Sequence, residues 1–359
     1  MSKHWPPRRQ TSRVLETLEV LRQNQAFRVL ETLKVLRKVS RNALAFLTFA
    51  LVVGTLPLWL HSPYLLSTAI FIGIFTIVTL GLCLLMGYAG QVSLGHAAFW
   101  GIGAYTSAIL TVKLGVSPWL AMIIGVAVTS GVAYLIAIPI FRLREHYLAM
   151  ATLGLGIIVT LAFGEFRELT GGPSGLPGVP RLTVGSFIFD GDVEYYYLVW
   201  GVVLLLIGLS LNIVNSRVGR ALRALHASEA AAASIGVDAS RLKLQVLVLS
   251  AAYASVAGSL YVHYMQFVSP HAFDFGVSVR LVVMAAVGGL ASVWGAPFGA
   301  AAVMLVTVLL REALPLVIPN ASGEHITIFY GLVLILIMIF MPEGLTRGVI
   351  ESFRRNARS

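Results

Sequence analysis

Long apolar runs recur along most of the chain and constrain its fold more than any other feature. A soluble fold cannot bury so much apolar side chain, because 57% of the 359 residues are hydrophobic and only 12% are charged, against about a quarter charged in soluble domains. A membrane-spanning helix needs roughly 20 mostly apolar residues. The sequence therefore predicts an all-α polytopic membrane protein. Its candidate spans are Leu44–Leu60, Tyr64–Met86, Ala97–Val112, Trp119–Phe141, Tyr147–Gly164, Tyr195–Val214, Leu244–Tyr264, Val279–Leu290, Pro297–Leu310 and Ile326–Met341.

The number of spans follows from these runs as about ten, with eight or nine as the alternative. Val279–Leu290 and Pro297–Leu310 are too short to cross a membrane alone. We therefore expect them to be half-helices or one broken element.

Basic residues orient the spans, because lysine and arginine collect on cytoplasmic loops. The basic segments are the N-terminal region, Phe141–Glu145, Asn215–Lys243 and the tail 345–359, whereas Glu165–Glu194 carries five acidic residues against two arginines. Ten spans with the N-terminus inside place every basic segment in the cytoplasm and the acidic loop outside. We expect both termini to be cytoplasmic. The net charge of +10 is thus assigned to loops beside the lipid bilayer and not to nucleic-acid binding.

Residues 1–43 form a separate extension that contains a near-exact duplication. Arg13–Arg22 reads RVLETLEVLR and Arg28–Arg37 reads RVLETLKVLR. Each copy places apolar residues at i, i+4 and i+7, which predicts one apolar stripe on a helix. An interfacial helix on an anionic leaflet and a helix that packs on its own protein, or frays, both fit this pattern. No signal peptide is indicated, because the charged segment lacks a compact apolar core.

Two glycine-rich stretches, Gly87–Phe99 and Gly288–Gly299, interrupt the apolar pattern, and both contain Gly-x-x-Ser. Paired interruptions in the two halves of a transporter point to the translocation path. The alternative is close helix packing, which small residues permit. Polar side chains at this depth need partners or water. The candidate path residues are therefore Gln91, Ser93, His96 and Ser292, although a lone histidine also fits a purely structural role.

No enzyme motif is present in the sequence. The chain has no Gly-x4-Gly-Lys-Ser/Thr phosphate loop, His-Glu-x-x-His, Cys-x-x-Cys or Gly-x-Ser-x-Gly. Neither catalytic residues nor a metal site are expected, and the single Cys83 excludes an intrachain disulfide framework. Carboxylates inside the predicted spans are scarce, whereas a proton-driven pump usually shows one at mid-span. The energy source is therefore expected to lie outside this chain.

The basic loop Asn215–Lys243 contains an alanine-rich stretch that favours a short helix. Ser228 is a suitable N-cap and Gly236 a suitable stop. Such a helix on a cytoplasmic loop can press on a soluble partner. The alternative is a solvated connector whose arginines only set the topology.

Five segments together resemble the LivM-type permeases of bacterial branched-chain amino acid ABC importers. The resemblance covers about residues 44–344, which we treat as the permease domain, and excludes the repeated extension. The segments are GYAGQVSLGHAAFWGIGAYTSAIL (Gly87–Leu110), HYLAMATLGLGIIV (His146–Val159), LTGGPSGLPGVP (Leu169–Pro180), the loop and span Ser216–Tyr261, and VVMAAVGGLASVWGAPFGAA (Val282–Ala301).

The resemblance implies a non-enzymatic subunit in the bacterial inner membrane that forms a path for branched-chain or similar apolar amino acids. The partners that it implies are a second permease subunit, two cytoplasmic ATPases that hold the ATP and Mg²⁺, and a periplasmic substrate-binding protein. Two alternatives stay open. One is an ABC permease for urea or short-chain amides, and the other, of a different class, is a stand-alone secondary transporter or channel.

The resemblance also implies a role for the basic loop. Importer permeases of this general kind carry an EAA-x3-Gly loop whose short helix docks on the ATPase. Here four residues stand between Glu229-Ala230-Ala231 and Gly236, one more than in that pattern. Alternatively, Ala230 occupies the glutamate position, and Ala231, Ala232 and Gly236 match.

Overall fold

The computed structural model describes residues 43–60, 62–141, 145–185, 187–317, 331–332 and 339. It divides after Trp59 into two units. In the first unit the described residues form one apolar helix, Ala43–Trp59, which matches the first candidate span. The repeated extension, most of the candidate span Ile326–Met341 and the basic tail lie outside the described residues.

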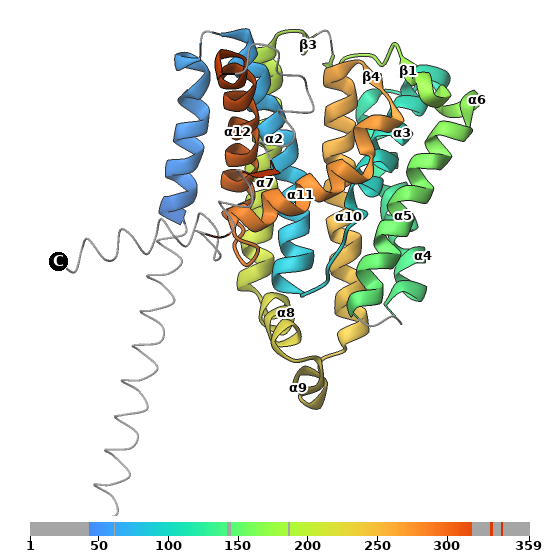
Figure 1. The fold of residues 1–359 in the computed structure, drawn as a ribbon, viewed down its shortest axis with the longest axis vertical. Helices are drawn as coiled ribbons and strands as arrows, with labels where there is room; N and C mark the ends of the chain where they lie inside the picture. Colours follow the sequence, from blue (N-terminus) through green and yellow to red (C-terminus); the bar gives the residue numbers. More distant parts are fainter. Residues whose placement is uncertain are drawn as a thin grey trace, which may run out of the picture. The chain divides into compact units, whose positions relative to one another are not determined.

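The second unit is built almost entirely from helices, which confirms the predicted fold class (Figure 1). The helices are α2 Pro63–Leu82, α3 His96–Leu114, α4 Pro118–Ile140, α5 Glu145–Glu165, α6 Arg167–Thr170, α7 Asp192–Asn215, α8 Arg217–Ala227, α9 Glu229–Ser234, α10 Ala239–Met265, α11 Phe275–Gly288 and α12 Gly295–Val317. The shorter elements are the π-helix η1 Cys83–Tyr88, the 3₁₀ helices η2 Gly172–Ser174 and η3 Pro270–Phe273, and the strands β1 Leu176–Pro177, β2 Thr183–Val184, β3 Phe187–Ile188 and β4 Phe267–Val268.

Eight helical segments of the described residues are long and apolar enough to cross a membrane. This number lies at the lower end of the predicted range. One expectation was wrong: the element predicted as Pro297–Leu310 is the 23-residue helix α12, long enough to span alone. It was underestimated because Arg311 and Glu312, which lie inside the helix, ended the apolar run. The other short element is indeed short, since α11 has 14 residues and reaches spanning length only together with η3.

The centre of this unit is formed by α2, α3 and α10. The spanning segment that contains α2 is 83% buried within the chain, whereas that of α5 is only 17% buried. Two buried side chains of α7 donate to the backbone of neighbouring spans: the Trp200 indole to the Ala69 carbonyl at 3.1 Å and the Tyr195 hydroxyl to the Leu260 carbonyl at 2.6 Å. These bonds join α7 to α2 and α10.

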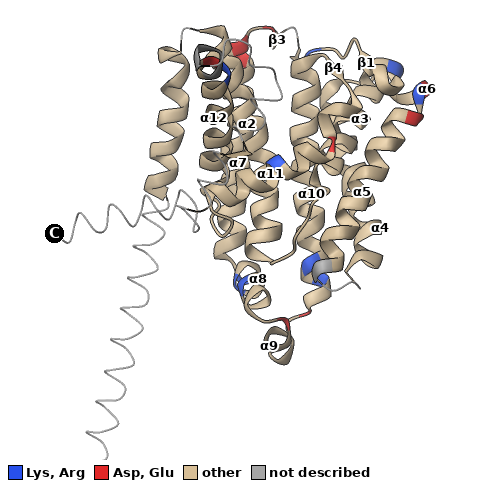
Figure 2. Cartoon of the chain, in the orientation of Figure 1, with Lys and Arg blue, Asp and Glu red and all other residues tan. Residues whose placement is uncertain are grey.

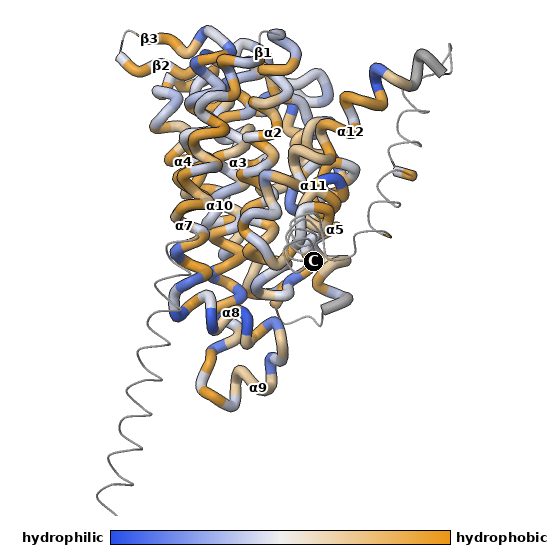
Figure 3. The backbone as a smooth tube through the Cα atoms, turned by 90° about the vertical axis from the view of Figure 1, so that its left-hand side faces the viewer, coloured by the Kyte–Doolittle hydropathy of each residue, from blue (hydrophilic) through white to orange (hydrophobic). Residues whose placement is uncertain are grey.

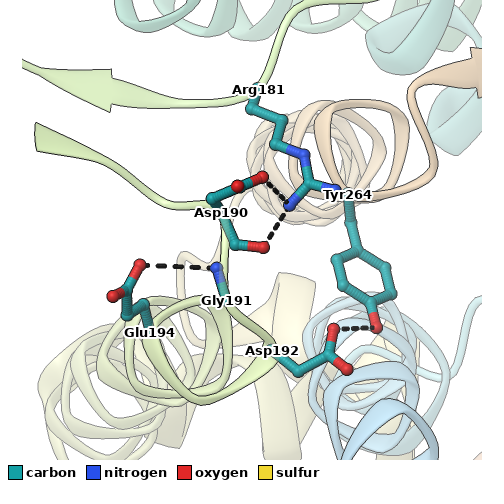
Figure 4. Close-up of polar contacts among 6 residues, drawn as sticks. All are labelled: Arg181, Asp190, Gly191, Asp192, Glu194 and Tyr264. Atoms are coloured by element: carbon teal, nitrogen blue, oxygen red, sulfur yellow. Dashed lines mark hydrogen bonds and ion pairs between the residues drawn. The ribbon is translucent and has the colours of Figure 1, made fainter. Parts of the chain in front are cut away.

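The segment between α5 and α7 folds over the ends of the spans and contributes three short strands, one of which pairs with β4 after α10. β1 pairs with β4 and β2 pairs with β3, both antiparallel. Arg181 forms an ion pair of 2.7 Å with Asp190, and Tyr264 donates to Asp192 at 3.0 Å (Figure 4). These contacts hold the turn that leads into α7 against the end of α10. Hydrophilic residues gather around α8 at the opposite end, and hydrophobic residues follow the spans between the two ends (Figure 3).

Candidate functional site

The first glycine-rich stretch is a non-helical linker between two spans, as the sequence predicts. α2 passes into the π-helix η1, residues 89–95 are not helical, and α3 begins at His96. The Gly90 and Gln91 amides still donate back to Met86 and Leu85, at 3.2 and 3.0 Å. Single π-turns are rare in proteins and occur frequently at functional sites.

The three polar residues predicted in this stretch are all buried. Gln91 is 7% exposed, Ser93 1% and His96 0%. The Nε2 atom of His96 lies 3.1 Å from the Ser250 hydroxyl of α10, and the Gln91 side-chain amide donates to the Ala89 backbone carbonyl at 3.0 Å. Among the described residues, Ser93 Oγ and His96 Nδ1 have no hydrogen-bond partner. Buried polar atoms normally have one, so a water or ligand group would be stabilised here.

The second glycine-rich stretch is a tight turn and not a linker. Residues 289–294 join α11 to α12 through two consecutive backbone hydrogen bonds, from Ser292 to Gly289 and from Gly295 to Ser292. A Cβ atom on Gly299 would lie 1.9 Å from the Met284 carbonyl oxygen. The glycine at that position therefore serves close packing, the alternative stated for these stretches. Ser292 is partly exposed, and among the described residues it makes only these backbone hydrogen bonds.

The two stretches meet in space. A Cβ atom on Gly87 would lie 1.8 Å from the Leu290 carbonyl oxygen. The last turn of η1 therefore rests directly on the α11–α12 turn. The two stretches are similar in composition, and in the structure they are also in contact.

The alanine-rich part of the basic loop forms the short helix α9, with the ends that the sequence predicts. Ser228 caps it by accepting from the Ala231 amide at 3.3 Å. Gly236 ends it with a φ of +82°, and its amide donates to Ala233 while Val237 donates to Ala232, at 3.0 and 3.1 Å. This pair of bonds is the Schellman arrangement, which requires a left-handed residue after the helix.

Not all of the alanines that match the coupling motif lie on the exposed face of α9. Ala230 and Ala231 are exposed, but Ala232 is only 1% exposed and packs against its own chain. The Glu229 carboxylate lies 2.7 Å from Lys243 Nζ, which ties α9 to α10. Sequence reasoning missed Ile235, which is 73% exposed at the end of α9. Its exposure could have been suspected from the sequence, because Ile235 is a large apolar residue within a polar loop.

Helix α8 connects this loop to the first glycine-rich stretch. A Cβ atom on Gly219 would lie 2.1 Å from the Val214 carbonyl oxygen, so α8 rests on the last turn of α7. Gly90 has a φ of +69°, and a Cβ atom there would lie 3.3 Å from Nδ1 of His226 on α8. A displacement of α8 would therefore press directly on the linker.

Charge is distributed unevenly between the ends of the spans. Lysine and arginine gather at the end that carries α8 and the first turns of α10, whereas the opposite end carries both signs (Figure 2). The basic residues of the first group are Arg217, Arg220, Arg223, Arg241 and Lys243.

Comparison with known proteins covers most of the described spans. Residues 64–341 match the family described as the branched-chain amino acid transport system / permease component. The chain is 32% identical over 295 residues to the high-affinity branched-chain amino acid transport system permease protein LivM of Salmonella typhimurium and of Escherichia coli, which covers 76% of this chain and 67% of each relative. It is 25% identical over 291 residues to the probable branched-chain amino acid transport permease protein LivH of Methanocaldococcus jannaschii, covering 77% of this chain and 90% of that relative. No solved structure matches the chain.

Proposed function

The chain belongs to the family of branched-chain amino acid transport permease components, and on this premise we propose that it forms part of the translocation path of an ABC importer for branched-chain or similar apolar amino acids. The observation that carries the proposal is the extent of the family match. It runs through both glycine-rich stretches and the α8–α9 loop, the parts that a path and a drive mechanism need.

The proposed complex contains four kinds of subunit. This chain pairs with a second permease, and the occurrence of relatives named both LivM and LivH in Escherichia coli supports a heterodimer. Two cytoplasmic ATPases hold ATP and Mg²⁺, because this chain has no phosphate loop. A periplasmic binding protein delivers the amino acid.

The proposed location is the bacterial inner membrane, with the α8–α9 end in the cytoplasm. The basic residues around α8 and the start of α10 support this orientation. The Arg181–Asp190 turn then faces the periplasm, on the side where the binding protein would dock.

In the proposed mechanism, α9 is the contact through which ATP-driven motion enters the chain. Its exposed alanines allow close approach to a groove, and its two capped ends and the Glu229–Lys243 ion pair keep it in place. The motion passes through α8 to the linker at Gly90. The last turn of η1, which leads into the linker, lies against the α11–α12 turn through Gly87, so both glycine-rich stretches would move together.

The decisive experiment is transport by the reconstituted complex in liposomes. The four kinds of subunit together should import leucine only when ATP is present. Leucine flux through this chain without ATPases would favour a secondary transporter, and uptake of urea in place of leucine would favour the amide permease.

The loop contact is tested by adding bulk to α9. Ala231→Trp should overpack the groove and cost about 1–3 kcal/mol, which corresponds to a loss of roughly fivefold to more than a hundredfold in affinity for the ATPases. ATPase stimulation by the loaded binding protein, together with co-purification, measures it. Ser240→Trp is the control, because Ser240 is also exposed but lies on the first turn of α10. Full stimulation by Ala231→Trp would mean that the contact lies elsewhere.

A further inference from the structure

A cavity of about 470 Å³ lies between α2, α11 and α12, with α3 and α10 contributing to its wall. This volume falls within the range of roughly 300–1,000 Å³ that is typical of small-molecule sites. The residues that line it are Tyr64, Ser67, Thr68, Phe71, Phe75, Trp100, Tyr261, Ala272, Val277, Arg280, Met304, Thr307, Val308 and Arg311. None of the path residues predicted from the sequence is among them.

Two arginines contribute the charge of this cavity. Arg280 comes from α11 and Arg311 from α12. Among the described residues that line the cavity, the two charged side chains are both cationic. Arginine within a spanning segment is rare and marks a substrate or ion pathway by default. Its planar fork of donors matches a carboxylate.

The cavity extends from one end of the spans toward their middle. On α2 the lining begins at Tyr64, next to the start of the helix, and ends at Phe75. Phe75 lies about 18 Å along the helix from Pro63 at the helical rise of about 1.5 Å per residue. That is more than half of the roughly 30 Å hydrocarbon core. In the proposed orientation the start of α2 is periplasmic, so the cavity lies where a substrate released by the binding protein would arrive.

Aromatic rings form the deep wall of the cavity. Phe75 and Tyr261 both contact Trp100, with ring centroids 5.5 and 5.1 Å apart, and Phe71 lies 6.3 Å from Tyr261. Such rings bury apolar side chains and attract an ammonium group to their faces. The hydroxyl oxygens of Ser67, Thr68 and Thr307 on the walls add acceptors.

We propose that this cavity is an amino-acid binding site, in which Arg280 binds the α-carboxylate and the aromatic wall receives an apolar side chain. Arg311 lies nearer the outer end and attracts the carboxylate on the way in. The inference rests on the proposed function and names the site that this function would use. An anionic lipid headgroup presents similar chemistry, an acid on an apolar body, so the experiment separates the two.

The test measures ligand-induced shifts of the thermal midpoint in the solubilised complex with its second permease, without binding protein. Millimolar leucine should raise the midpoint of the wild-type complex by several degrees. Leucinamide, which lacks the carboxylate, and short-chain phosphatidylglycerol should not. The Arg280→Gln variant should lose the leucine shift, and Arg280→Lys should retain part of it. Arg241→Gln is the matched control, because Arg241 lies on α10 outside the cavity.

Each other outcome overturns the site in a different way. An equal shift with leucinamide would exclude recognition of the carboxylate, and this arm needs no variant. A shift with phosphatidylglycerol alone would identify a lipid site. Loss of the second permease from Arg280→Gln during purification would assign Arg280 to the subunit contact. An unchanged leucine shift and unchanged uptake in Arg280→Gln would reject the site while the proposed function stands. Failure of the wild-type complex to import leucine would reject the function itself.

Discussion

The two glycine-rich stretches look alike in the sequence and differ in the structure. The first, between α2 and α3, is a linker that buries Gln91, Ser93 and His96. The second, between α11 and α12, is a tight turn whose glycines let two helices pack closely. Glycines permit close packing in both stretches, at Gly87 as at Gly299, and the difference lies in the buried polar side chains, which only the first stretch combines with a linker between spans. A glycine motif alone does not separate a path from a packing contact.

The largest effect is expected where the two stretches touch. In Gly87→Ala the new Cβ atom would meet the Leu290 carbonyl oxygen at 1.8 Å, and backbone on one side must move. We expect a loss of about 3 kcal/mol or more in stability, measured as the thermal midpoint of the complex and its yield from membranes.

The matched control for this replacement is Gly201→Ala on α7, where a Cβ atom would have no neighbour within 4 Å. It should be neutral, or stabilise the helix by up to about 1 kcal/mol. Equal loss in both variants would contradict the direct contact between the stretches.

The second-largest effect is expected at His96, a buried polar residue of the first stretch that has no counterpart in the second. His96→Leu leaves the buried Ser250 hydroxyl without its imidazole partner, and we expect a loss of about 1–3 kcal/mol. Uptake per assembled complex should fall as well.

The double replacement His96→Leu with Ser250→Ala separates the two roles of this histidine. Removing both partners should recover part of the stability. Uptake should stay low if the imidazole serves the path. Recovery of uptake together with stability would make His96 a structural residue.

A smaller effect is expected at Gly90, where the linker meets α8. Gly90→Ala forces a left-handed conformation on alanine, which costs about 1–2 kcal/mol. It should also weaken stimulation of the ATPases, since the new methyl group contacts His226. Gly115→Ala is the control, because Gly115 has a similar φ of +62° but no neighbour within 4 Å. If both variants stimulate equally well, α8 does not drive the linker.

The smallest effect is expected at Ser292 in the second stretch. Ser292→Ala keeps the backbone hydrogen bonds of the turn, so stability should change by no more than about 0.5 kcal/mol and uptake by less than twofold. A large loss of uptake with normal assembly would instead place this serine in the path, and both stretches would then contribute to it.

Apolar runs predicted most of the fold because each spanning helix is specified by its own consecutive residues. The candidate Trp119–Phe141 differs from α4 by one residue at each end. The ends of α9 were predictable for the same reason, since Ser228 and Gly236 act within a few residues of themselves. α12 was underestimated because charged residues near a helix end do not stop a helix, although they do end an apolar run.

The proposed binding cavity could not be predicted from the sequence. Its residues come from five helices and the segment before α11, between Tyr64 and Arg311, and only packing brings them together. Arg280 was visible inside a predicted span, but its position gave no indication of the aromatic residues beside it. The burial of Ala232 was equally hidden, because consecutive alanines on a six-residue helix look alike until one of them packs.

The aromatic wall has a consequence for the membrane as a whole. Trp100 contacts Phe75, Tyr261 and Phe273 with centroid separations between 5.0 and 5.5 Å, and among the described residues its Nε1 atom donates no hydrogen bond. A continuous file of water needs polar groups to sustain it, and apolar constrictions close by dewetting. In the proposed transporter these packed rings would interrupt a file of water below the cavity. The resting permease would then not leak protons along this route.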